Sequence, residues 1–196
     1  LHVTLTAEWY TLRWRPLVTG ERTKSFVRPD GTMHYTVDDL VDASPDLDAL
    51  MEEVDAQYEL LSNLGFELRY LDTHMGVDRV PGLAERIAEF CAKKKLVNNR
   101  ESFDSGAIAR LPDWPGPGEH PGTELADHLA QVPAGTYLLV GHPATKDEAI
   151  HHIRHEGLAP GDVAMQRNRQ RRMFMDIEII DYCENVGIEL LRYTDL

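Results

Sequence analysis

The order of strand-like and helix-like segments is the feature that most constrains the fold of this chain. Alternating β-prone residues over 2–7 predict a strand, and an apolar face with helical spacing over 44–64 predicts a helix. Further strands are predicted at 66–72, 136–140 and 188–191, with helical segments between them. Strands that alternate with helices are typical of a parallel sheet or barrel with covering helices. The sequence therefore predicts an α/β protein.

The remaining predicted helices follow from apolar spacing and from end signals such as capping residues and glycine. They are expected around 83–95, around 123–132, from Thr145 onward, and over a last apolar face at 173–183 that Gly187 closes. Residues 8–44 and 98–122 show no clear period, and both segments are predicted as long loops. Loops of this length are uncommon in a compact domain and are usually functional or partly disordered.

Composition limits the classes of protein to which the chain can belong. A length of 196 residues predicts one domain over 1–196, and no apolar run approaches the roughly 20 residues that span a bilayer. A net charge of −13 argues against nucleic-acid binding, which requires a basic surface. Cys91 and Cys183 lie in apolar helical stretches and are predicted as free thiols, which indicates the cytoplasm. An exposed sheet edge would allow a homodimer.

Histidines lie in or directly after three of the strand-like segments. His2 lies in the first, Asp72-Thr73-His74 ends the second, and His142 follows the strand at 136–140. Strand ends meet at one mouth of a parallel fold, where neutral imidazoles can bind a metal ion. Asp72 and His74 are two residues apart in an extended segment, so they point to the same side as co-ligands or as a ligand with its orienting partner. Spacing alone leaves open the alternative that each histidine is a hydrogen-bonded structural residue.

Five segments carry recognisable motifs: residues 1–9, 13–17, 71–76, 141–144 and the C-terminal 187–196. In this order, the motifs resemble those of the YdjC-like carbohydrate deacetylases, which include chitooligosaccharide deacetylases and deacetylases of hopanoid synthesis. The resemblance covers nearly the whole chain. The resemblance implies an irregular (β/α) barrel related to the polysaccharide deacetylases.

The resemblance also implies a site for one divalent metal ion, Mg²⁺ or Zn²⁺, held by an aspartate and two histidines. By motif, the two histidines fall on His2 and His74, and Asp72 matches the aspartate of the second motif. The family opens with an Asp-Asp pair on its first strand, and this chain begins after that segment. The domain is therefore expected to be N-terminally incomplete, without the first strand–helix portion and its metal-binding aspartate.

The activity that the resemblance implies is removal of N-acetyl groups from amino-sugar oligosaccharides or glycolipids. His142 would serve as the catalytic acid. The base would be an aspartate of the N-terminal pair that this chain lacks, and Asp72 could replace it only if its geometry allows. Trp9 and Trp14 are candidate stacking faces for a pyranose, and Arg167 is a candidate substrate contact. The plainer interpretation of the tryptophans is loop anchoring, and that of Arg167 is a solvated helix start.

Two other functions remain open. The chain could be a non-catalytic sugar-binding relative that lacks the base, or a different metal-dependent hydrolase such as a phosphoesterase. Metal-dependent release of acetate from N-acetylglucosamine oligomers would separate the deacetylase from both alternatives.

Overall fold

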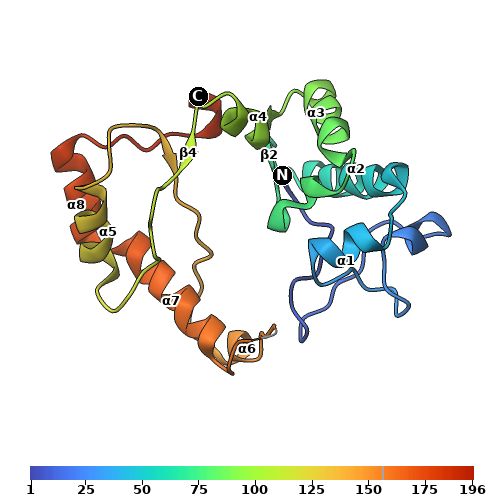
Figure 1. The fold of residues 1–196 in the computed structure, drawn as a ribbon, viewed down its shortest axis with the longest axis horizontal. Coiled ribbons are helices and arrows are strands. Elements are labelled where there is room, and N and C mark those ends of the chain that lie inside the picture. Colours follow the sequence, from blue (N-terminus) through green and yellow to red (C-terminus); the bar gives the residue numbers. More distant parts are fainter. Residues whose placement is uncertain (156) are drawn as a thin grey trace. The chain divides into compact units, whose positions relative to one another are not determined.

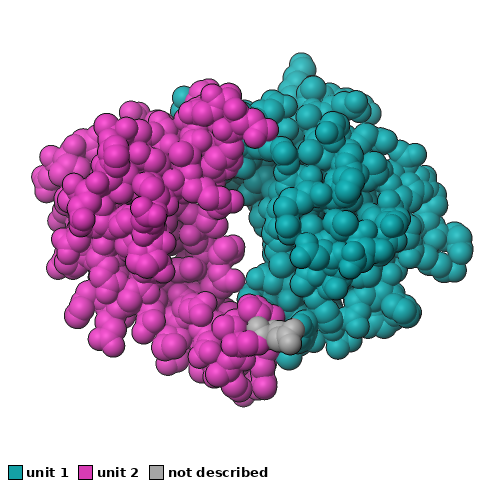
Figure 2. Space-filling model, in the orientation of Figure 1, with its two compact units in different colours: residues 1–101, 193–195 teal, residues 102–192, 196 magenta. Residues whose placement is uncertain are grey.

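The computed structural model describes residues 1–155 and 157–196, and the chain divides into two compact units. Unit 1 comprises Leu1–Glu101 with Tyr193–Asp195, and unit 2 comprises Ser102–Arg192 with Leu196. Figure 1 traces the elements, and Figure 2 colours the two units separately. In the described part of the chain, no helix is long and apolar enough to span a membrane. The assignment of 1–196 to a single domain stays a prediction.

Unit 1 contains a parallel sheet in the order β1-β2-β3, together with the helices that pack near it. Its elements are β1 (His2–Val3), the 3-10 helix η1 (Arg22–Ser25), α1 (Val37–Asp42), α2 (Leu47–Asn63), β2 (Tyr70–Thr73), the 3-10 helix η2 (His74–Arg79), α3 (Leu83–Lys94), β3 (Val97–Asn98) and the 3-10 helix η3 (Tyr193–Asp195). Helix α4 (Asn99–Asp104) begins in unit 1 and ends in unit 2.

The core of unit 1 forms because strands and helices bury apolar faces against each other. Val3 and Leu71 contribute from neighbouring strands, Leu50 and Val54 from α2, and Ile87 from α3. Each such aliphatic side chain contributes about 1.5–3 kcal/mol when it leaves water. Helix α2 begins where the Asp46 carboxylate accepts hydrogen bonds from the amides of the first turn, two residues after the predicted start at Ser44.

Cys91 is a free thiol in this core and is 2% exposed. Burial is the main cause that raises the pKa of Cys91 to about 11. Because the thiolate is the reactive form, iodoacetamide at pH 8 is expected to modify Cys91 at least tenfold more slowly in the folded protein than in guanidinium. Peptide mass spectrometry would measure this, with the half-buried Cys183 as an internal comparison. Equal rates in the folded and denatured protein would contradict the burial of Cys91.

Unit 2 combines two short parallel strands with a group of helices. Its elements are β4 (Ala109–Arg110), α5 (Pro121–Leu129), β5 (Tyr137–Leu138), α6 (Glu148–His151), α7 (Asp162–Met175) and α8 (Ile177–Val186). Strand β4 pairs in parallel with β5, and the core contains Leu125, Met173 and Ile179 from α5, α7 and α8. Parallel strands in both units confirm the predicted mixed α/β fold, while closure into a barrel stays a prediction.

The structure corrects several predicted elements. The segment 188–191, predicted as a strand, has irregular backbone, because no strand among the described residues pairs with it. Leu190 in this segment is 89% exposed. The apolar face predicted over 173–183 is divided between α7 and α8. The division falls at Asp176, whose carboxylate accepts a hydrogen bond from the Glu178 amide and so begins a new helix.

The two predicted loops contain short regular elements that the sequence pattern did not indicate. Segment 8–44 includes η1 and α1, and α1 begins with a capping box between Thr36 and Asp39. Segment 98–122 includes α4 and β4 and the start of α5. These elements have six residues or fewer, apart from α5, and are too short for an apolar period to be recognised.

Candidate functional site

The candidate site of unit 1 forms where β1 pairs with β2. The parallel register places His2 opposite Asp72 and Val3 opposite Thr73. The Asp72 amide donates to the carbonyl of Leu1 at 3.0 Å, which fixes this register. Val3 is buried while His2 is exposed, so a slip of one residue would turn His2 into the core. The register therefore sets which side chains reach the site.

His2 lies between an aspartate and a second histidine. Its Nδ1 is 3.1 Å from Asp72 Oδ1, and its Nε2 is 3.4 Å from His74 Nδ1. The two imidazole rings stand nearly perpendicular, at 80°, with centroids 5.4 Å apart. The structure thus brings the two predicted metal ligands, His2 and His74, together with Asp72, the candidate base.

Two residues with left-handed backbone directly follow His74 at the end of β2 and form a kink. Met75 has φ 53° and Gly76 has φ 69°. Glycine adopts this conformation readily, whereas a non-glycine residue there costs about 1–2 kcal/mol. Met75 is held in part by a hydrogen bond of 3.5 Å from the Thr6 hydroxyl to its sulfur. The kink fixes the position at which His74 leaves the strand.

Asp78 anchors the same kink from its other end. Its Oδ1 accepts a hydrogen bond of 2.9 Å from the Thr73 hydroxyl, and its Oδ2 accepts one of 2.7 Å from Arg100 Nη1. Only 15% of the Asp78 side chain is exposed, so these bonds are partly shielded from water. The backbone on both sides of His74 is therefore tied to neighbouring elements.

Glu8 completes the group from the segment that follows β1. Its Oε2 lies 3.7 Å from Nε2 of His74, on the ring nitrogen that does not face His2. The backbone of Glu8 is left-handed, with φ 58°, and its amide donates to the Tyr35 carbonyl at 3.1 Å. His74 therefore lies between an imidazole and a carboxylate.

The two candidate stacking tryptophans have different environments. Trp9 is 8% exposed, which favours the interpretation that it anchors its loop. Trp14 is only partly buried, its ring centroid lies 6.4 Å from that of His74, and its Nε1 donates to the Thr6 carbonyl at 3.1 Å. Of the two, Trp14 is the one that the structure brings beside the histidine pair.

The loop that carries Trp14 is held by Asp30. The Asp30 carboxylate accepts hydrogen bonds from the hydroxyl and amide of Thr32 and contacts Arg13 Nη1 at 3.1 Å. The hydrogen bond from the Thr32 hydroxyl is the largest cause that lowers the pKa of Asp30 to about 2. The Met33 amide donates to the Trp14 carbonyl at 3.0 Å. Trp14 thus belongs to an ordered segment of the predicted loop.

His142 and Arg167 belong to unit 2. The His142 amide donates to Oε1 of Gln170 at 2.8 Å, and the Ala144 amide donates to the Arg167 carbonyl at 3.2 Å. These bonds fix the segment after β5 against α7. The imidazole of His142 is exposed, and Arg167 is half-buried within α7 rather than at its start.

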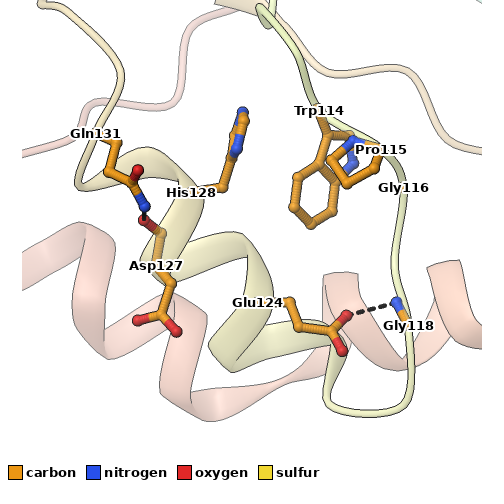
Figure 3. Close-up of a pocket in the computed structure, with 8 residues that line it drawn as sticks. All are labelled: Trp114, Pro115, Gly116, Gly118, Glu124, Asp127, His128 and Gln131. Carbon is orange, nitrogen blue, oxygen red and sulfur yellow. Dashed lines mark hydrogen bonds between the residues drawn. The ribbon is translucent and has the colours of Figure 1, made fainter.

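Unit 2 also contains an open cavity of about 460 Å³ beside α5 (Figure 3). Its lining residues are Trp114, Pro115, Gly116, Gly118, Glu124, Asp127, His128 and Gln131. The Glu124 carboxylate accepts hydrogen bonds from the amides of Gly118 and His120, the first of which is the main cause that lowers its pKa. His128 Nε2 lies 2.8 Å from the Pro112 carbonyl oxygen. Glu124 and His128 therefore hold the cavity wall in place.

The nitrogen atoms of His2 and His74 have the spacing of two ligands of one ion. Zinc–nitrogen bonds of about 2.0–2.1 Å in tetrahedral geometry place two nitrogens about 3.3–3.4 Å apart, and the observed separation is 3.4 Å. Across the described residues, no group of three or more His, Cys, Asp or Glu side chains is arranged to hold a metal ion. The pair therefore fits part of a metal site and supplies two nitrogen donors.

Comparisons with known proteins identify the relatives of this chain. The profile described as YdjC-like protein matches residues 1–185. The chain belongs to the YdjC-like family. This membership confirms the predicted relationship and gives the broad class, a carbohydrate-related hydrolase.

One solved structure similar to this YdjC-like chain is that of a proposed cellobiose-phosphate cleavage protein from Enterococcus faecalis V583. The TM-score is 0.74 at 18% identity, and the alignment covers 100% of this chain and 76% of the other. At this identity the likeness shows the fold. The chain has no significant match among curated proteins.

Glu8 belongs to the group around His74 in this YdjC-like chain, although the sequence pattern does not indicate it. An extended segment from His2 would carry every second residue on one side, so residues 2 and 8 share a parity that could have indicated a common face. The predicted strand ends at Ala7, so the sequence pattern does not extend the same face to Glu8.

Proposed function

We propose that this chain is a divalent-metal-dependent carbohydrate deacetylase that acts on N-acetylated amino-sugar oligosaccharides or glycolipids. The observation that carries the proposal is the 3.4 Å separation of His2 Nε2 and His74 Nδ1 at the ends of paired parallel strands. Membership in the YdjC-like family supports a sugar as the substrate. The whole-barrel architecture and the homodimer are proposed with it.

His2 and His74 would hold the ion through Nε2 and Nδ1. When bound, a divalent ion polarises the amide carbonyl and lowers the pKa of a water molecule. Asp72 lies at Nδ1 of His2, so it favours the tautomer that leaves Nε2 free to bind. Two imidazole donors favour Zn²⁺ over Mg²⁺, because Mg²⁺ prefers oxygen ligands.

The roles of the other residues are proposed from chemistry and motif. His142 would protonate the leaving amine, and Arg167 would contact the substrate. Asp72 remains the candidate base, but its 3.1 Å contact with His2 favours an orienting role instead. Trp14, beside His74, offers a sugar-stacking face, whereas the burial of Trp9 favours loop anchoring.

Acetate release from N-acetylglucosamine oligomers tests this function. The chain is expected to release acetate with Zn²⁺ or Mg²⁺, to lose activity in EDTA, and to recover it when the metal is returned. Cellobiose phosphate and a generic phosphodiester serve as competing substrates. Cellobiose phosphate is included because the similar E. faecalis structure is that of a proposed cellobiose-phosphate cleavage protein. Metal-dependent cleavage of either one without acetate release would contradict the deacetylase. Sugar binding without turnover would favour the non-catalytic relative.

A further inference from the structure

The two ring nitrogens of His74 face different partners. Nδ1 lies 3.4 Å from His2 Nε2, and Nε2 lies 3.7 Å from Glu8 Oε2. Both side chains of the second pair are largely shielded, with 15% of His74 and 23% of Glu8 exposed. Partial burial weakens screening by water, so the carboxylate acts on the imidazole more strongly than a surface pair would.

A carboxylate at this position has a defined effect on a metal-binding histidine. An imidazole that binds through Nδ1 carries its proton on Nε2, and a carboxylate at Nε2 fixes that tautomer, orients the ring and raises its basicity. Asp72 faces His2 in a corresponding way, with the two nitrogens exchanged, and its contact of 3.1 Å is shorter than the 3.7 Å between Glu8 and His74. Each histidine of the pair therefore has a carboxylate on the nitrogen that faces away from the other histidine.

The backbone of Glu8 gives a second, independent observation. Its φ of 58° is left-handed, a conformation that costs a non-glycine residue about 1–3 kcal/mol and that clusters at functional sites. Two hydrogen bonds hold it there, from the Ala7 amide to the His34 carbonyl and from the Glu8 amide to the Tyr35 carbonyl. The strand-like segment after β1 thus turns at the residue whose carboxylate reaches His74.

We propose that Glu8 is a positioning residue for His74, which it holds in the tautomer and orientation that present Nδ1 to a divalent ion. The inference rests on the proposed function only in requiring that an ion bind at the His2–His74 pair. It adds to the site a carboxylate from a different segment of the chain.

Glu8→Gln tests the role because it keeps the shape of the side chain and removes its charge. Binding of Zn²⁺ by calorimetry is expected to weaken about 10- to 100-fold, and the visible spectrum of the Co²⁺-loaded protein is expected to change. The Tm of the metal-free protein should stay close to that of the wild type. Glu21→Gln is the matched control, because Glu21 is an exposed residue that pairs with Lys24, and its metal binding should be unchanged.

Glu8→Gly separates positioning from folding. Glycine adopts the left-handed backbone without strain, so this variant should fold with a Tm at or near that of the wild type and still bind Zn²⁺ as weakly as Glu8→Gln. Wild-type affinity and Co²⁺ spectrum in Glu8→Gln would overturn the role of Glu8 alone. Failure of the wild type to bind either ion would overturn this role together with the proposed metal site.

Discussion

Replacing His74 with alanine is expected to weaken Zn²⁺ binding by more than about 100-fold and to abolish metal-dependent acetate release. His74 Nδ1 is one of two nitrogen donors that face each other at 3.4 Å, and the variant leaves only His2. Loss of an orienting partner weakens metal binding about 10- to 100-fold, so loss of the ligand itself should exceed that range. Titration calorimetry and the acetate assay would measure the two effects.

His120→Ala is a suitable control for this variant. Its side chain is exposed in unit 2, and its backbone amide donates to Glu124 independently of the imidazole. We expect wild-type metal affinity for this variant, and circular dichroism would verify that both variants are folded. If His74→Ala kept both its metal content and its activity, the assignment of the site to the β1–β2 pair would be wrong.

Replacing Gln57 with leucine is expected to lower the free energy of unfolding by about 2–4 kcal/mol. Gln57 Nε2 donates to the Thr4 carbonyl at 2.7 Å and to Glu53 Oε1 at 2.9 Å, and Gln57 Oε1 accepts from the Thr4 amide at 3.1 Å. Glu53 is 1% exposed and accepts a further bond from the Val18 amide. Leucine removes three partners at once, and each buried group left unsatisfied costs about 1–3 kcal/mol.

Equilibrium unfolding in urea would measure the loss, with an unchanged m-value as the sign that the folded state is intact. Gln131→Leu offers a control, because Gln131 is exposed and donates to the Asp127 carbonyl at 3.0 Å. Its effect should lie within about 0.5 kcal/mol. If Gln57→Leu lowered the free energy of unfolding by less than about 1 kcal/mol, the proposed contribution of the two Gln57–Thr4 hydrogen bonds would be wrong. Because Thr4 lies between His2 and Glu8, weaker metal binding should accompany the instability.

The two longest helices of unit 1, α2 and α3, could be predicted from sequence because local chemistry determines them. α2 and α3 follow apolar spacing, and their observed bounds lie close to the predicted 44–64 and 83–95. Helix α7 of unit 2 does not follow apolar spacing, because residues 166–172 are all polar and only the two ends of the helix bury apolar side chains. The strand predicted at 188–191 has suitable residues but no pairing partner in the described chain, and strand formation depends on that partner.

The candidate site was predictable only in part, for a related reason. Residue types and motif order indicated His2, Asp72 and His74, although nothing in their spacing showed that β1 and β2 are neighbours. For Glu8, the parity that it shares with His2 is the only signal in the sequence, because its contact with His74 depends on a left-handed turn and on two backbone hydrogen bonds to the loop at 34–35. The different environments of Trp9 and Trp14 likewise arise from tertiary packing rather than from sequence pattern.

The pairing of β1 with β2 also has a consequence for the order of folding. His2 and His74 are 72 residues apart, so their meeting requires closure of a long loop, whereas α2 and α3 form from local contacts. The ligand pair should therefore come together only after those helices have begun to form. An ion that binds to the His2–His74 pair would stabilise the native state more than the transition state for folding, because the pair forms late. Such an ion would act mainly by slowing unfolding.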